Sequence, residues 1–230
     1  VVTADGSGHV APHLVLAVDP PALATLVSTA PQLAELAPDL VRRMPRFGTP
    51  GPPYAVARYW LGGDVAPERA AFSGVSRQPT LDSVTLCHRL ERPAGEWAGR
   101  TGGSVVELHA YACLPGVPAD ELAGRMRREL AGLWPEVADL PVVDLRARVE
   151  ARAPAFAPGG HGDRPGVATA ADGLWLAGDG IAADFPSALM ERAAATGILA
   201  ANGILRRVGA ATEPLWSVRP YGLLAGRRGG

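Results

Sequence analysis

With 230 residues, the chain is long enough for one large domain or two small ones, and its formal net charge is only −1. This balance excludes a basic surface for nucleic acid, and 47% hydrophobic against 20% charged residues excludes a disordered chain. The composition therefore predicts a folded globular protein with no nucleic-acid partner.

The cysteines and the apolar runs limit the environment in which the chain works. Cys87 and Cys113 are far apart and lie in segments predicted as strands, so we expect two buried free thiols and no metal site. No apolar run is long enough to cross a bilayer, and the first residues lack a signal-peptide pattern, which indicates a cytoplasmic protein. Because Val1 falls inside a predicted strand, we also expect a piece of a longer protein.

The first quarter of the chain alternates short strands and helix. Residues 1–4 and 13–18 are predicted as strands, and residues 22–29 have helical spacing of their apolar side chains. Gly6-Ser7-Gly8 is interpreted as a hairpin turn, because the third glycine and the following helix of a dinucleotide loop are missing. The stretch 45–53 is dense in Pro and Gly, which is typical of a crossing between two domains.

The middle of the chain predicts a mixed or antiparallel sheet covered by one helix. The extended segments are residues 54–61, 83–90, 104–112 and 141–151. The last of them alternates apolar and charged residues, as a sheet with one wet face requires. Between the third and fourth, Leu122, Met126, Leu130 and Leu133 lie on one face of a helix over 118–134.

The most informative segment follows a loop over 155–165. Residues 173–177 are predicted as a short buried strand, residues 178–180 as a turn, and residues 188–205 as a long, nearly uncharged helix with Pro186 just before its start. This order places unpaired N–H groups at the carboxyl edge of a sheet, where α/β proteins bind anionic groups. Asp179, between two glycines, can accept hydrogen bonds from a polyol hydroxyl.

The same segment resembles a known family. GLWLAGD (residues 173–179) and PSALMERAAATG (residues 186–197) are similar to the C-terminal flavin-contact motif of the flavin amine oxidase and carotenoid desaturase superfamily. The resemblance implies FAD as the cofactor, with the turn on the ribityl side and the start of the helix under the ring. The cofactor-binding residues it implies are Gly178, Asp179, Gly180, Pro186, Leu189, Met190 and Glu191. Where most members have Gly after Met-Glu, this chain has Arg192, and an exposed Glu191–Arg192 pair is the alternative interpretation.

A narrower resemblance extends over residues 70–218. The segments DFPSALMERAAATGILAAN, PTLDSVTLCHRLE and SVVELHAYAC look like the bacterial carotenoid ring-aromatising enzymes of the isorenieratene synthase type. The resemblance implies desaturation of a carotenoid β-ring with migration of a methyl group. A hydrophobic, carotenoid-like substrate needs an apolar tunnel, for which Tyr59, Trp60 and Tyr111 are candidates, and it would favour peripheral contact with the inner face of the membrane. No catalytic base is assigned: for His88 and His109 a core role is favoured.

Together these observations predict a mixed α/β fold made of a partial FAD-binding, Rossmann-like domain and a mixed-sheet substrate domain. Residues 1–45 and 156–208 are assigned to the FAD-binding domain, 46–155 to the substrate domain and 209–230 to an irregular tail. No G-x-G-x-x-G is present, so we expect the missing N-terminal FAD-binding half as a partner. Two alternatives stay open: a flavin amine oxidase-type enzyme with another substrate, and a non-catalytic remnant that binds an isoprenoid or a partner protein.

Overall fold

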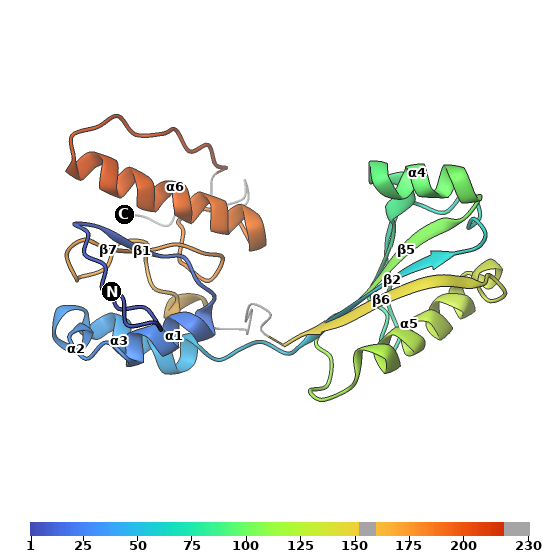
Figure 1. Cartoon of the computed structure of the whole chain (residues 1–230), viewed down its shortest axis with the longest axis horizontal. Helices are drawn as coiled ribbons and strands as arrows, with labels where there is room; N and C mark the ends of the chain where they lie inside the picture. The colour runs from blue at the N-terminus through green and yellow to red at the C-terminus, as the bar shows by residue number, and fades with distance from the viewer. Residues whose placement is uncertain (152–159, 219–230) are drawn as a thin grey trace, which may run out of the picture. The chain divides into compact units, whose positions relative to one another are not determined.

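The computed structural model describes residues 1–151 and 160–218, and these form two compact units (Figure 1). Unit 1 consists of Val1–Pro50 and the described part of Pro154–Gly230, and unit 2 of the described part of Gly51–Ala153. The boundary after Pro50 falls inside the Pro- and Gly-rich stretch of the sequence. Helices, a parallel strand pair and an antiparallel sheet are all present, which confirms the predicted mixed α/β class.

Unit 1 is a three-layer arrangement around a parallel pair of strands. Strand β1 (Leu14–Leu16) pairs with β7 (Leu174–Leu176), although the two are far apart in the sequence. Figure 1 shows this pair between α6 (Leu189–Arg207) and a group of three helices. Those three helices are α1 (Pro20–Ser28), α2 (Leu33–Leu36) and α3 (Pro38–Phe47). A 3₁₀ helix, η3 (Gly160–Asp163), lies against α3.

Proline decides where the first helices begin. The Asp19 carboxylate caps α1 by accepting a hydrogen bond from the Ala22 N–H at 2.8 Å, and Pro20 stands at a position where no backbone N–H is needed. Pro38 starts α3 in the same way, and α3 continues through Pro45. The sequence predicted α1 but neither α2 nor α3, because the prolines at positions 31, 38 and 45 interrupt the helical periodicity of this stretch.

The two sides of β7 are covered differently. Leu174 and Leu176 contribute to an apolar core with buried side chains of α1 and α3. Trp175, between them, faces α6, where a Cβ added at Gly203 would lie 2.2 Å from the indole ring. Gly203 is therefore required for the close approach of α6 to the strand.

Unit 2 is an antiparallel sheet with strand order β3-β4-β5-β2-β6. Its strands are β2 (Tyr54–Leu61), β3 (Phe72–Gly74), β4 (Ser83–Leu86), β5 (Ser104–Ala110) and β6 (Val142–Glu150). Four of the five correspond to the predicted extended segments. The short edge strand β3 was not predicted.

The segment predicted as extended over 83–90 is a strand only in its first half, so this prediction was partly wrong. The chain leaves the sheet after Leu86 and enters a 3₁₀ helix, η1 (Cys87–Arg89), followed by α4 (Arg92–Thr101). Cys87 and His88 are therefore not strand residues. Gly102, in the left-handed conformation with φ 70°, ends α4 and turns the chain into β5.

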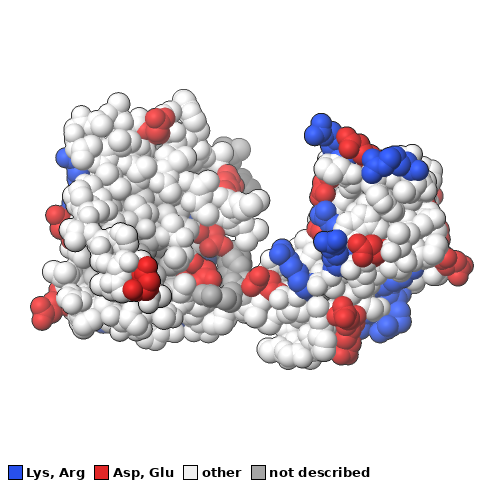
Figure 2. Space-filling model, viewed as in Figure 1, with Lys and Arg blue, Asp and Glu red and all other residues white. Residues whose placement is uncertain are grey.

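The two faces of this sheet have different covers. Helix α5 (Ala119–Leu133) lies along one face, where Tyr59 and Met126 are part of the core of unit 2. Helix α4 and η1 lie over one end of the other face (Figure 1), against Trp60 and Val105. A further 3₁₀ helix, η2 (Pro135–Val137), follows α5. Basic and acidic side chains are interspersed over the visible surface of unit 2, whereas unit 1 shows scattered acidic and few basic side chains on this side (Figure 2).

Candidate functional site

The turn after β7 is tied to α6 by a single buried hydroxyl. Thr196 is 0% exposed, and its Oγ1 accepts a hydrogen bond from the Gly178 N–H at 2.9 Å while lying 3.0 Å from the Gly178 carbonyl oxygen. Gly178 has φ 140°, which favours glycine at this position. The turn over 178–180 is thus held against the N-terminal half of the helix.

The start of α6 is open. Ala188 is the N-cap residue and provides no side-chain hydrogen bond, so the first N–H groups of the helix have no capping partner among the described residues. Leu189 and Met190 are 54% and 87% exposed. Leu189 has φ 52°, a strained conformation for a leucine. The structure leaves these donors accessible to a bound acceptor.

Two buried polar groups beside this helix end have no partner. Arg192 is 8% exposed, and its Nε and Nη1 atoms form no hydrogen bond among the described residues. Ser187 is 9% exposed, and its Oγ is likewise unpartnered there. Arg192 precedes Thr196 by one helical turn, so both lie on the stripe of α6 that faces the turn. The alternative interpretation of Glu191 and Arg192 as an exposed pair is wrong for Arg192: Glu191 is exposed, but Arg192 is buried.

The structure brings together some of the expected cofactor residues and adds others. Gly178, Asp179 and Gly180 form one half-buried turn, and the Asp179 carbonyl accepts a hydrogen bond from Arg164 Nη1 at 3.0 Å. Pro186, like the first residues of α6, is exposed. Sequence reasoning missed Ser187 and Thr196 and set Arg192 aside. A serine directly before the helix and an arginine within a run of alanines were the available signals.

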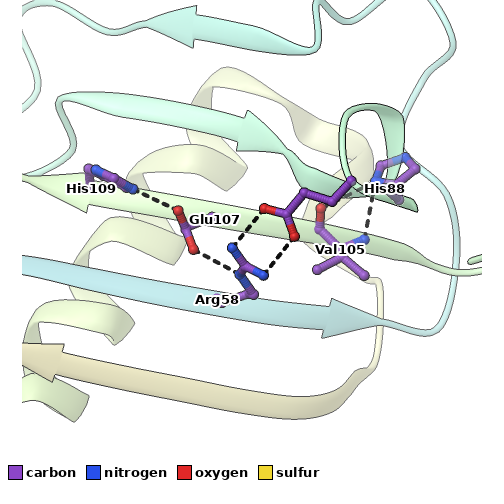
Figure 3. Close-up of polar contacts among 6 residues, drawn as sticks. Arg58, His88, Val105, Glu107 and His109 are labelled. Atoms are coloured by element: carbon purple, nitrogen blue, oxygen red, sulfur yellow. Dashed lines mark hydrogen bonds and ion pairs between the residues drawn. The ribbon is translucent and has the colours of Figure 1, made fainter. Parts of the chain in front are cut away.

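A second cluster of polar side chains lies on β2 and β5 of unit 2 and at the start of α4 (Figure 3). Arg58 Nε donates a hydrogen bond to Glu107 Oε2 at 2.8 Å, and Nη1 and Nη2 donate to the two oxygens of Glu91, each at 3.0 Å. Glu107 also contacts His109, whose Nε2 lies 2.9 Å from Oε1. The hydrogen bond from His109, aided by Arg58, lowers the pKa of Glu107 to about 2. This arrangement keeps a carboxylate charged next to an imidazole.

The two histidines named from the sequence have different surroundings. The His88 side chain is 7% exposed, and its Nδ1 lies 3.2 Å from both the N and the O atom of Val105, so it belongs to the interior of unit 2 (Figure 3). The His109 side chain is 24% exposed and connects Glu107 to Tyr111, whose hydroxyl lies 3.1 Å from Nδ1. His88 Nε2 lies 3.2 Å from Oδ1 of Asp64, whose side chain is 56% exposed, so each histidine has one side-chain contact that reaches the surface.

The three aromatic residues expected to line a tunnel do not lie together. Tyr59 is 4% exposed, in the core under α5. Trp60, the next residue of the strand, faces the opposite side and packs beside η1 and α4. Tyr111 follows β5 and is 56% exposed. Adjacent residues of a strand point to opposite faces, so Tyr59 and Trp60 cannot line one cavity from a single face of this sheet.

Both cysteines are free and buried, and burial raises the pKa of Cys87 to about 12. Within residues 1–151 and 160–218, no His, Cys, Asp or Glu cluster is suited to hold a metal ion. Over the same residues, no helix is long and apolar enough to cross a membrane.

Comparison with known proteins bears on the family of the chain. The family model described as flavin containing amine oxidoreductase matches residues 1–205. A carotenoid phi-ring synthase of Streptomyces griseus is 42% identical over 205 residues, which cover 89% of this chain and 39% of that protein. A carotenoid phi-ring synthase of Chlorobaculum tepidum is 37% identical over 175 residues, or 75% of this chain and 27% of that protein. The chain thus spans between a quarter and two fifths of these relatives.

Solved structures share the fold. An oxidoreductase from Methanosarcina mazei matches 83% of this chain with a TM-score of 0.52 and 18% identity, over 42% of its own length. A reduced UDP-galactopyranose mutase matches 92% of this chain with a TM-score of 0.55 and 9% identity, over 44% of its own length. The family match and the two relatives confirm the resemblance inferred from the sequence, and the solved structures confirm the mixed fold.

Proposed function

Because the chain belongs to the flavin-containing amine oxidoreductase family, we propose that it forms part of an FAD-dependent enzyme that desaturates and aromatises a carotenoid β-ring. In this proposal unit 1 contributes the flavin-facing turn and helix start, and unit 2 is the substrate domain. The cofactor-binding residues are those of the turn 178–180 and of the segment 186–191.

The observation that carries the proposal is the buried side chain of Arg192 near the start of α6, whose Nε and Nη1 atoms have no hydrogen-bond partner among the described residues. A buried charge without a partner is costly, so its presence indicates an acceptor that comes from outside the described residues. The free N–H groups of the helix and the Ser187 hydroxyl fit the same acceptor, because phosphate oxygens and the pyrimidine carbonyl of a flavin are anionic or accept hydrogen bonds. When bound, the flavin supplies the two-electron oxidation, and the chain supplies binding and orientation.

The substrate class comes from the relatives. Two proteins named carotenoid phi-ring synthase share 42% and 37% of their aligned residues with this chain. A carotenoid ring with its polyene is hydrophobic, which would favour peripheral contact with a membrane. An amine oxidation within the same family and a non-catalytic role that keeps only isoprenoid or protein binding are the alternatives.

The partner that the proposal requires is a dinucleotide-binding half. The 230 residues contain no G-x-G-x-x-G, and the matched relatives have well over half of their length outside the aligned region. Without that loop the FAD pyrophosphate lacks its anchor. We therefore propose that the chain alone binds FAD weakly and that addition of this half restores tight binding.

The test is reconstitution of the full chain with the dinucleotide-binding half of the Streptomyces relative, followed by visible absorbance of bound FAD and product analysis with β-carotene. We expect flavin binding, flavin reduction by β-carotene and an aromatic-ring product. Arg192→Met should weaken FAD binding by about 10- to 100-fold, the contribution of a charge-assisted hydrogen bond. Arg206→Met, an exposed arginine of the same helix, is the control and should leave FAD affinity unchanged.

The alternatives give different results in the same assay. Flavin reduction by a simple amine but not by β-carotene would support amine oxidation. Polyene binding with no flavin reduction by any substrate would support the non-catalytic role. Tight FAD binding by the chain alone would contradict the requirement for a second half.

A further inference from the structure

We propose that the outer edge of β6 is the docking site for an extended segment of the dinucleotide-binding half, which joins the sheet of unit 2 as a further strand. The inference rests on the proposed function, because that function requires this half, and it adds the place where the half attaches. Strand β6 (Val142–Glu150) has nine residues and is the last strand in the order β3-β4-β5-β2-β6. The strand at the opposite edge, β3, has three residues, so β6 is the longer edge of this sheet.

The hydrogen bonds of the sheet fix which backbone groups of β6 point away from it. In an antiparallel sheet, the N–H and C=O groups of successive residues face alternate neighbouring strands. The His109 carbonyl accepts a hydrogen bond from the Asp82 N–H at 2.9 Å, so the odd-numbered residues of β5 face β4 and the even-numbered ones face β2. Through the register of β5, β2 and β6, the even-numbered residues of β6 then face β2. The odd-numbered residues Ala147 and Val149 therefore face outward.

An independent contact gives the same direction. The Leu145 N–H donates to the carboxylate of the preceding residue, Asp144 Oδ1, at 2.9 Å, so it points away from β2. Ala147 and Val149, two and four residues further along the strand, share this direction. Their N–H groups have no acceptor among the described residues. The edge of β6 thus carries unpaired backbone donors, and only the one at Leu145 is satisfied by a side chain.

The apolar side of β6 is incompletely covered. The side chains of Leu145, Ala147 and Val149 pack against the core of unit 2 on the side of α5, but they stay partly exposed. Their partners on β2 are buried, at 4%, 0% and 1% exposure: Tyr59, Ala57 and Ala55. A strand added beside β6 would place its own alternate side chains next to the partly exposed residues. The apolar core therefore has room for one more strand at this edge.

The other side of β6 defines the charge that the occupant should have. Asp144, Arg146 and Arg148 lie on this side and are exposed. In a sheet, an acidic side chain directly opposite an arginine is favourable, and a basic one is unfavourable. We therefore expect the docking segment to alternate apolar residues with polar or acidic ones, the latter facing Arg146 and Arg148.

The dinucleotide-binding half is the occupant that the comparisons favour. The aligned regions cover 39% and 27% of the two phi-ring synthases, so well over half of each lies outside the region shared with this chain. A long edge strand with unpaired groups pairs readily with another chain, and natural proteins shorten or cover such edges. In strand addition, main-chain hydrogen bonds give affinity and alternate side chains give specificity. A partner that the proposed enzyme already needs is thus the segment that covers β6.

Hydrogen exchange tests the docking in the full chain, alone and co-expressed with the dinucleotide-binding half of the Streptomyces relative. In the chain alone, the amides of Ala147 and Val149 should exchange fast, whereas those of Arg146 and Arg148, which face β2, should be protected. In the complex, Ala147 and Val149 should exchange at least about 10-fold more slowly. Unchanged exchange of these two amides in the complex would overturn the docking. Protection that grows with the concentration of the chain alone would overturn it as well, because the occupant would then be a second copy.

Three substitutions at one position separate backbone pairing from other effects. Ala147→Pro removes the outward N–H, which an edge strand tolerates, and should raise the dissociation constant of the complex about 10-fold while Arg146 and Arg148 stay protected. Ala147→Lys keeps the N–H but places a charge on the side that the added strand buries, so it should weaken the complex too. Ala147→Val keeps the N–H and the apolar character and is the matched control. Equal dissociation constants for the three variants would overturn the docking at β6.

The visible absorbance of bound FAD separates this inference from the proposed function. If the complex binds FAD tightly but Ala147 and Val149 stay unprotected, the docking edge alone is wrong. If the half protects both amides but the complex binds no FAD, the docking is supported and the proposed function is contradicted. If no complex forms, both are contradicted.

Discussion

Two arginines with low exposure, one in each unit, differ in what surrounds them. The side chain of Arg58 is 30% exposed, and three of its nitrogens donate to the carboxylates of Glu107 and Glu91. Arg192 is 8% exposed, and two of its nitrogens form no hydrogen bond within the described residues. The fold therefore accounts for the position of the first arginine but not for that of the second.

This difference shows how a binding group can be distinguished from a structural one. A guanidinium that is saturated by its own chain stabilises the folded unit and has little capacity left for a ligand. A guanidinium that is buried and unsaturated lowers the stability of the ligand-free chain and gains it back when an acceptor binds. Variants that change one arginine at a time should separate these two situations.

The largest expected effect is loss of stability in unit 2. Arg58→Met leaves two partly buried carboxylates next to each other without a cation, and we expect the free energy of unfolding of unit 2 to fall by about 2 kcal/mol. Native-state hydrogen exchange of the β5 amides in urea measures this unit by itself. Arg146→Met, on the neighbouring strand with a 78% exposed side chain, is the control and should change stability by less than about 0.5 kcal/mol. Equal effects of the two variants would contradict the comparison.

A smaller loss is expected one helical turn away from Arg192. Thr196→Val keeps the shape of the side chain but removes the hydroxyl that serves the Gly178 N–H and carbonyl. Leaving those groups without a partner should destabilise unit 1 by about 1 to 2 kcal/mol, measured by hydrogen exchange in α6. Thr196→Ser retains the hydroxyl and should recover most of the loss. If the serine variant is as unstable as the valine variant, packing of the methyl group and not the hydrogen bonds holds the turn.

The opposite sign is expected at Arg192 itself. Arg192→Met removes a buried charge of which two nitrogens have no hydrogen bond among the described residues, so the FAD-free chain should become more stable by about 1 kcal/mol. Urea titration of α6 hydrogen exchange measures the gain, and Arg206→Met again serves as the exposed control. A clear loss of stability would show that the guanidinium has a partner within the chain.

The smallest effect is a dependence of unit 2 stability on pH. The folded pKa of Glu107 lies at about 2, below the ordinary value of 4.5, chiefly because His109 and Arg58 bond to the carboxylate. A lowered carboxyl pKa adds stability that is complete above about 4.5 and is lost as the pH falls toward about 2. Glu107→Gln should flatten the decline of β5 protection in this window. A variant with the same slope as the unaltered chain would exclude Glu107 as its source.

Local patterns predicted much of the fold. Strands β2, β5 and β6 and helices α1, α5 and α6 follow from alternation, helical spacing and proline positions, which act over a few residues. Helix α4 was not predicted. The end of β4 was predicted too late, at residue 90, because the apolar residues between Leu86 and Leu90 fit a strand as well as a turn. Helices α2 and α3 were not predicted, because Pro31, Pro38 and Pro45 punctuate this stretch and Pro45 lies inside α3, where a proline normally argues against a helix.

The candidate sites were predicted less completely. The turn 178–180 and the start of α6 were recognised because their spacing is a local feature of strand, turn and helix. The burial of Arg192 and the chain of contacts through Tyr111, His109, Glu107 and Arg58 were not, because each depends on which strands pair and in which register. The prediction that Tyr59 and Trp60 line one tunnel failed for a related reason: neighbours along a strand lie on opposite faces of the sheet.

The sequence by itself determined most of the longer elements, the family resemblance and the segment that faces the flavin in the proposal, because helices, turns and motifs are set by neighbours along the chain. Only the tertiary structure decided that β1 pairs with β7, that Arg192 is buried without a partner and that a tyrosine, a histidine and two carboxylates meet around Arg58. The physical reason is that burial and hydrogen-bond satisfaction are properties of packed surfaces, and packing joins residues that the sequence separates.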